Sequence, residues 1–170
     1  NVFVEEEQEI FIYPKKKPLI YKKIVDKTAT KSSILSTKDF KLAKKTFELI
    51  KNRKWKTAIT YAKKAKDKRL YKLVQWLYLK EENNSATFYD YLNFINFNDN
   101  YPRLGRLKYL AERKINFNNI DPNVIIKYFD INNPLSGYGK IKLGEAYLSK
   151  NNYDLGVKFI KEGFKTAKLS

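Results

Sequence analysis

Short apolar stripes with a period of three to four residues follow one another from Ser36 onward. The first stripe runs through Phe40, Ala43, Phe47 and Ile50. Residues at this spacing share one face of an α-helix, and such a face must be buried against another element. Short polar loops separate the stripes, and no segment after residue 40 reads as a clear strand. The pattern predicts eight helices of about 8–15 residues, joined as antiparallel pairs in series.

Helix start signals accompany several of these stripes. Asp and Ser side chains accept hydrogen bonds from the first free backbone N–H groups of a helix, and Pro fits the first helical position. The predicted start positions of the third to the seventh helix, in chain order, are Asp67, Ser85, Pro102, Asp121-Pro122 and Ser136.

One helix pair near the start of this region resembles another near its end. Adding 98 to the residue numbers of the first set gives the second, and the two sets are Leu49, Trp55, Ala58, Ala62, Ala65 and Tyr147, Tyr153, Gly156, Ile160, Gly163. In both sets an aromatic residue begins the second helix and small residues follow, as in tetratricopeptide hairpins, whose repeat is about 34 residues. The pairs between them match the pattern poorly. The predicted fold class is all-α: a helical-hairpin superhelix, or tetratricopeptide-like α-solenoid, over residues 39–170.

Residues 1–38 have a different composition. Glu5, Glu6 and Glu7 precede the alternating stretch EIFIY, and Pro14 and Pro18 flank three lysines. Prolines and runs of like charge oppose a helix. We therefore expect an extended, basic, proline-containing arm, either a plain linker or an arm with one short strand.

The basic residues of the chain are mostly lysines. The formal net charge is +17, and only five of the 35 basic residues are arginines: Arg53, Arg69, Arg103, Arg106 and Arg113. Arginine is the favoured side chain for bidentate contacts with phosphates and base edges. This composition favours a solvated lysine surface over a nucleic-acid partner, and a binding face for another anion stays open as the alternative.

Several classes of site are excluded by composition. The chain contains neither Cys nor His, which removes thiolate nucleophiles, histidine bases and zinc sites built on either ligand. No apolar run approaches the ~18 residues of a membrane span. We predict no catalytic, cofactor-binding or metal-binding residue, no cofactor and no transmembrane segment. Because the sequence starts at Asn1 without a leader, a processed or truncated start is expected.

A cluster of glycines raises the question of a phosphate loop. The stretch NPLSGYGKIKLGEAYL places Gly137, Gly139 and Gly144 around a predicted helix start. A nucleotide loop needs a preceding strand or a G-K-[ST] sequence, and neither is present. We therefore interpret Gly137 and Gly139 as a turn into a helix, and Gly144 and Gly105 as points of close helix–helix contact.

Four stretches give the chain a family resemblance. They are YPKKKP, LSTKDFKLAKKTFELIKNRKWKTAITYAKKAKDKRLYKLVQW, FINFNDNYPRLGRLKYLAER and IIKYFDINNPLSGYGKIKLGEAYLSKNNYDLGVKFIKEGF, which together span about residues 12–168. In order and spacing they resemble the N-terminal superhelical, U-shaped domain of soluble lytic murein transglycosylases of the alphaproteobacterial type.

The resemblance implies a periplasmic protein of a Gram-negative bacterium. Members of this family cleave the β-1,4 bond between N-acetylmuramic acid and N-acetylglucosamine in peptidoglycan and leave a 1,6-anhydro end. Their superhelix helps to hold glycan strands, and the reaction takes place in a C-terminal lysozyme-like domain on a Glu that is usually followed by Ser. The implied partners are peptidoglycan glycan strands and the protein's own catalytic domain.

The chain departs from that family in lacking the catalytic sequence. It contains no Glu-Ser dipeptide, and its acidic residues are expected on scattered polar faces, which leaves no pair for glycosidase chemistry. It also ends just after a hairpin, where a solenoid would expose an apolar face. We therefore expect the N-terminal, non-catalytic part of a longer protein, which positions or binds glycan.

Two other functions are compatible with the sequence. Degenerate helical repeats also occur in tetratricopeptide-like modules that bind a protein partner. The net charge alone suggests a nucleic-acid binder, whose affinity would fall steeply with salt. The aromatic residues Trp55, Trp76 and Tyr101 are predicted to pack in the core rather than to stack on sugars.

Overall fold

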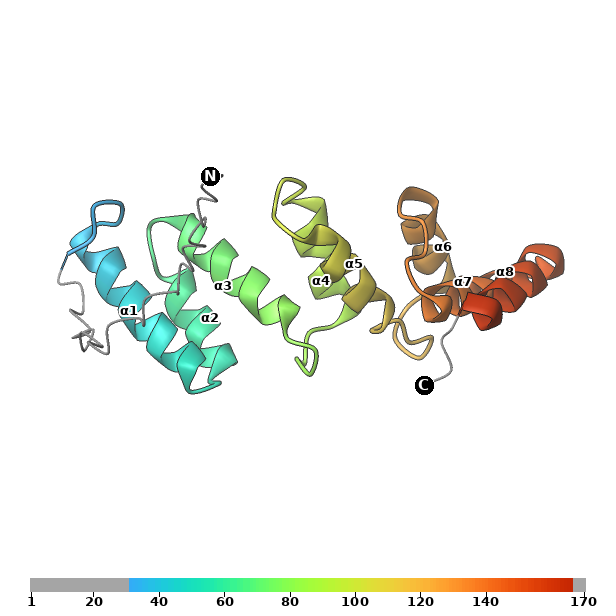
Figure 1. The fold of residues 1–170 in the computed structure, drawn as a ribbon, viewed down its shortest axis with the longest axis horizontal. Coiled ribbons are helices and arrows are strands. Elements are labelled where there is room, and N and C mark those ends of the chain that lie inside the picture. The colour runs from blue at the N-terminus through green and yellow to red at the C-terminus, as the bar shows by residue number, and fades with distance from the viewer. Residues whose placement is uncertain (1–30, 167–170) are drawn as a thin grey trace, which may run out of the picture. The chain divides into compact units, whose positions relative to one another are not determined.

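A computed structural model describes residues 31–166 of the 170-residue chain. The described residues form α-helices and no strand (Figure 1). The helices are α1 (Thr37–Lys51), α2 (Trp55–Lys63), α3 (Lys68–Lys80), α4 (Phe88–Asn96), α5 (Leu104–Glu112), α6 (Pro122–Ile131), α7 (Gly137–Ser149) and α8 (Tyr153–Thr166). The all-α prediction is confirmed for this region. Residues 1–30 of the arm that was predicted over residues 1–38 lie outside the described residues.

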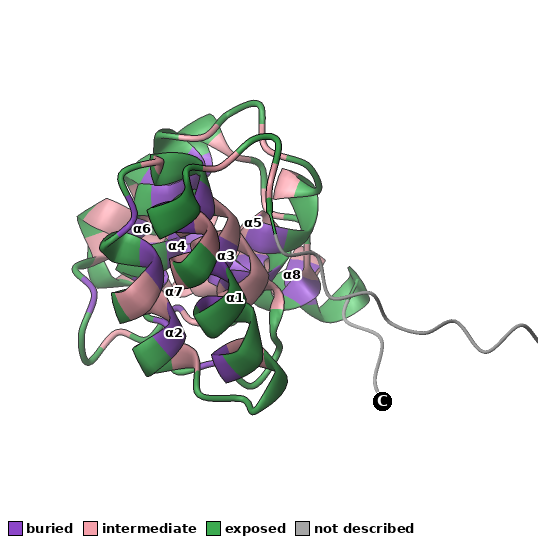
Figure 2. Cartoon of the chain, turned by 90° about the vertical axis from the view of Figure 1, so that its left-hand side faces the viewer, coloured by how far each residue is buried: buried purple, intermediate pink, exposed green. Residues whose placement is uncertain are grey.

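Helices pack mainly against helices that are close in sequence. Contacts join α1 to α2, α2 to α3, α3 to α4, α4 to α5, α6 to α7 and α7 to α8. Contacts between helices that are not consecutive join α3 to α5 and α5 to α7. Most helices therefore have one buried side and one exposed side, as Figure 2 shows.

The buried apolar side chains form two clusters. The smaller one contains residues of α1 and α2 together with Leu70 and Val74 from the first half of α3. The larger one extends from Leu79, near the end of α3, to Leu143 and Ala146 of α7. Helix α3 thus contributes to both clusters.

The two related helix pairs share the same turn. The backbones of Arg53 and Asn151 are left-handed, with φ of 56° and 61°. In the first turn the N–H of Lys54 donates to the carbonyl of Leu49 at 2.9 Å, and the corresponding bond in the second turn measures 3.0 Å. These are Schellman helix ends, in which the left-handed position is usually glycine. The two turns lie 98 residues apart, at the spacing that the sequence predicted.

Small residues let the second helix of each related pair approach its neighbour. Ala58, Ala62 and Ala65 are completely buried. In the second pair, a methyl group on Gly144 would lie 2.7 Å from the carbonyl oxygen of Gly156. A methyl group on Gly163 would lie 2.7 Å from the carbonyl oxygen of Gly137. The prediction that Gly144 serves a close helix–helix contact is confirmed.

Three local predictions are wrong. Gly105 is exposed, and a methyl group there would meet nothing within 4 Å, so it serves no close contact. Pro102 lies in the turn before α5, whose N-cap is the left-handed Arg103. The N-cap of α4 is Thr87, which forms a capping box with Asp90.

The remaining start signals are confirmed, because they depend on neighbours in sequence. Asp67, Asp121 and Ser136 cap α3, α6 and α7, and Pro122 is the first residue of α6. Ser85, which was the predicted cap of α4, instead lies 2.9 Å from the hydroxyl of Tyr78 through its own hydroxyl.

Candidate functional site

Two acidic residues of the described region are buried, although the sequence predicted the acids on scattered polar faces. Glu112 at the end of α5 is 1% exposed, and Asp39 in the first turn of α1 is 4% exposed. The expectation that all acids lie on polar faces is therefore wrong for these two. Their partners decide whether either is available for a reaction.

Glu112 is bound by the residues that begin α7. The backbone N–H groups of Leu135 and Ser136 donate to its carboxylate at 2.6 and 2.9 Å. The hydroxyl of Ser136 also donates to it, and accepts a bond from the N–H of Gly139 at 2.9 Å. Burial raises the pKa of Glu112, and these three hydrogen bonds lower it in part. Gly139 at this helix start therefore lies against a carboxylate of the chain itself, since a methyl group on Gly139 would overlap Glu112.

Asp39 has the same kind of partners. The N–H groups of Lys66 and Asp67 donate to its two carboxylate oxygens at 2.9 and 3.0 Å. These hydrogen bonds, with that from Lys66 the larger cause, hold the pKa of Asp39 below its usual value of 3.8. Each buried acid thus accepts hydrogen bonds from the N-cap residue of a helix and from the residue just before that N-cap. Both carboxylates therefore accept hydrogen bonds from the fold and do not face the solvent.

The substitution Asp39→Asn is expected to make stability less sensitive to acid. Because the folded pKa of Asp39 is lowered, its ionised form stabilises the native state above pH 3.8, and this stabilisation is lost as pH falls through the folded pKa. Urea unfolding at pH 7 should show the variant to be less stable than the wild type. The difference should shrink near pH 2, and a difference that does not change with pH would contradict this role.

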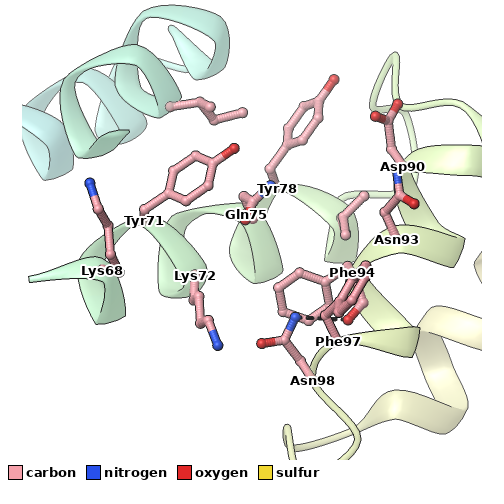
Figure 3. Close-up of a pocket in the computed structure, with 12 residues that line it drawn as sticks. Lys68, Tyr71, Lys72, Gln75, Tyr78, Asp90, Asn93, Phe94, Phe97 and Asn98 are labelled. Carbon is pink, nitrogen blue, oxygen red and sulfur yellow. Dashed lines mark hydrogen bonds between the residues drawn. The ribbon is translucent and has the colours of Figure 1, made fainter. Parts of the chain in front are cut away.

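A groove between α3 and α4 offers a different kind of site. It has a volume of about 640 Å³ and lies inside the region that the structure describes. Figure 3 shows Tyr71, Gln75 and Tyr78 projecting from α3, with Asn93 on the facing helix α4. Phe94 forms part of the floor, and the full lining is Ile59, Lys68, Tyr71, Lys72, Gln75, Tyr78, Leu79, Asp90, Asn93, Phe94, Phe97 and Asn98.

Aromatic and amide side chains make up much of the lining of this groove. Aromatic rings come from Tyr71, Tyr78 and Phe97, and the Phe97 side chain is 80% exposed although it is apolar. Amides come from Gln75 and Asn93, which can each donate and accept hydrogen bonds.

The charges that line the groove differ in their availability. The ammonium of Lys68 donates to the carbonyls of Lys63 and Ala65, which end α2. The carboxylate of Asp90 accepts bonds from Thr87 in the capping box. Lys72 takes part in none of the ion pairs formed within the described region. The groove is therefore suited to an uncharged or anionic ligand with flat apolar faces and many hydroxyl or amide groups.

The three aromatic residues singled out in the sequence have mainly structural contacts. The indole N–H of Trp76 donates to the carbonyl of Pro102 at 2.9 Å, and the Lys80 ammonium lies 4.0 Å from the centre of its ring. Tyr101 packs edge-on against Phe94 at 5.2 Å. Both belong to the rim of the larger cluster, as predicted. Trp55 is half-buried against Tyr78 and belongs to neither cluster, so it lies next to the site rather than in the core.

The described residues contain neither a cluster of metal ligands nor a membrane-spanning helix. No group of three or more Asp, Glu, Cys or His side chains is placed to hold a metal ion among them. None of the helices between residues 31 and 166 is long and apolar enough to cross a membrane.

The groove and its residues were not identified from the sequence. Tyr71, Gln75 and Tyr78 are spaced at four and three residues, which is a helical face, but this face lies beside the apolar stripe of the same helix and was not singled out. Comparisons of this chain with protein-family models, curated proteins and solved structures gave no match.

Proposed function

We propose that this chain is the N-terminal scaffold part of a periplasmic soluble lytic murein transglycosylase and that it holds peptidoglycan strands without cleaving them. The bond cleaved in the whole protein is the β-1,4 bond between N-acetylmuramic acid and N-acetylglucosamine. The groove between α3 and α4 is the observation that carries this proposal, because its lining has the chemistry of a glycan site.

Each type of lining side chain has a counterpart in the polymer. Aromatic faces pack against the apolar faces of pyranose rings, and amides bond to hydroxyl and N-acetyl groups. Lysines attract the carboxylates carried by the peptide stems. A net charge of +17 extends this attraction beyond the groove.

The two buried acids among residues 31–166 support a scaffold role, because both carboxylates face the backbone of the fold. Asp39 and Glu112 each bind two backbone N–H groups of the fold. A carboxylate that protonates a glycosidic oxygen must instead face the substrate. The reaction is therefore assigned to a separate catalytic domain of the same protein.

A solenoid arrangement of the hairpins forms part of this proposal. It is supported by contacts between helices near in sequence and by the related turns at Arg53 and Asn151. A tetratricopeptide-like superhelix of this kind presents a long surface built from successive helix pairs. A polymer of repeating disaccharides is suited to such a surface.

The substitution Phe97→Ala is expected to weaken binding to purified peptidoglycan about 3- to 10-fold, because removal of one stacking ring costs about 0.5–1.5 kcal/mol. Co-sedimentation of the 170-residue chain with insoluble peptidoglycan measures this. Phe164→Ala is the matched control, because Phe164 is 65% exposed on α8 and lies outside the groove.

Three results of this experiment decide between the functions. Equal weakening of peptidoglycan binding by both substitutions would show that the groove is not the glycan site. No sedimentation of the wild type, combined with capture of one specific protein, would support the tetratricopeptide-like interaction module instead. Retention on a generic DNA duplex with a steep loss of affinity in salt would support the nucleic-acid alternative.

A further inference from the structure

A cationic hollow shares Tyr78 with the groove. Two adjoining depressions of about 460 and 410 Å³ share Arg53, Trp55 and Asn83 in their linings. Tyr78 also lines the groove, so its side chain belongs to both surfaces. We use the name Arg53 hollow for these two depressions together.

Basic side chains outnumber acidic ones in the Arg53 hollow. The basic members are Arg53, Lys54, Lys56, Lys80 and Arg106, and the acidic members are Glu81 and Glu82. Arg106 is paired with Glu82 at 2.6 Å, and Lys80 lies over the ring of Trp76. None of the ion pairs among residues 31–166 involves Arg53, Lys54 or Lys56. The free positive charge is therefore concentrated on the side of the hollow formed by residues 53–56.

An apolar wall accompanies this charge. The Trp55 and Tyr78 rings lie 5.7 Å apart, inclined at 45°, and both are half-buried. The hydroxyl of Tyr78 is held by Ser85, which fixes the orientation of the ring. A ligand that fits the hollow combines an anionic group with an aliphatic or flat portion. A peptide carboxylate with a neighbouring side chain has this form.

We propose that the Arg53 hollow binds a carboxylate of the peptidoglycan stem peptide while the groove binds the sugars to which the stem is attached. This inference rests on the proposed function, since it names the part of the polymer that the second surface contacts. The planar guanidinium of Arg53 can bind a carboxylate through two parallel hydrogen bonds. Glu81 and Glu82 make the same surface unfavourable for a continuous polyanion such as a nucleic-acid backbone.

The backbone of Arg53 allows a clean test of its side chain. Its left-handed φ of 56° is a conformation in which glycine is favoured over any residue with a Cβ atom. Arg53→Gly therefore removes the guanidinium and also removes the backbone strain of a left-handed residue with a Cβ atom. The thermal midpoint of this variant should equal or exceed that of the wild type, so weaker binding would not reflect misfolding.

The experiment compares Arg53→Gly with the wild type on three ligands. These are intact peptidoglycan, glycan strands from which an amidase has removed the stems, and the released stem peptides in solution. Arg113→Gln is the matched control, because Arg113 is exposed and lines neither the groove nor the hollow. Co-sedimentation measures binding to the insoluble polymer, and titration calorimetry measures binding to the soluble ligands.

The expected result is selective. Arg53→Gly should weaken binding to intact peptidoglycan and to stem peptides about ten-fold, which corresponds to the loss of about 1.4 kcal/mol. It should leave binding to stem-free glycan unchanged, and Arg113→Gln should change none of the three.

Four other results are distinguishable. Equal binding of Arg53→Gly and wild type to intact peptidoglycan would overturn the inference and leave the proposed function intact. Equal loss on stem-free glycan would also overturn it, because the hollow would then contact sugar. Binding of stem peptides without binding of either polymer would support the hollow and contradict the scaffold function. Equal weakening by Arg113→Gln would show charge attraction alone and overturn the inference.

Discussion

Replacing Gly144 with alanine should lower the free energy of unfolding by about 3 kcal/mol. The added methyl group would lie 2.7 Å from the carbonyl oxygen of Gly156 and 2.9 Å from the backbone nitrogen of Ile160. Backbone atoms of α8 cannot rotate away as a flexible side chain could, so the two helices must separate. Urea unfolding followed by circular dichroism measures the loss.

Gly105→Ala is the matched control for this result. The same methyl group at position 105 meets no atom within 4 Å, and the residue lies in helix α5. Alanine is favoured over glycine in a helix by about 0.5–1 kcal/mol. The control should therefore be as stable as the wild type or slightly more stable. A destabilisation of similar size in both variants would refute the close packing of α7 on α8 as the cause.

The second large effect is expected for Glu112→Ala, which should cost about 3 kcal/mol of stability. It removes the acceptor for the N–H groups of Leu135 and Ser136 and for the Ser136 hydroxyl. Buried donors without an acceptor cost about 1–3 kcal/mol each, although water entering the space reduces the sum. Thermal unfolding at pH 7 measures the change. An unchanged midpoint would show that this carboxylate does not hold the start of α7.

The pH dependence of Glu112 should be opposite to that of Asp39. Burial raises the folded pKa of Glu112 above its usual value of 4.5, so the native state retains a proton that the unfolded chain has released. Its contribution to stability therefore falls as pH rises from 4.5 through the folded pKa. Glu112→Gln, which does not titrate, should lack this fall. The comparison of both proteins by urea unfolding across this range checks the sign.

Local sequence signals account for most of the correct structural predictions. Asp67, Asp121-Pro122 and Ser136 begin helices because an N-cap requires only a side-chain oxygen and the following two or three N–H groups. The start of α4 was predicted at Ser85, although the Thr87 and Asp90 spacing of a capping box was present in the sequence. Competing local signals therefore placed that helix two residues early.

The buried acids and the groove depend on contacts that no local pattern contains. Glu112 and its partners are 23 and 24 residues apart, and Asp39 binds residues 27 and 28 positions away. Both acids look like ordinary solvent-facing charges in the sequence. Gly105 and Gly144 likewise differ only in what lies opposite them. These properties come from the packing of distant segments. The helical period predicts that helices pack together, but it does not predict which residues of two helices lie opposite each other.

The division of apolar side chains along α3 bears on how the chain unfolds. Leu70 and Val74 are buried with α1 and α2, whereas Leu79 is buried with the helices that follow. Loss of the first hairpin would expose one half of α3 and leave the other half anchored. Helix α3 therefore links the two clusters, and we expect its loss to expose apolar side chains of both.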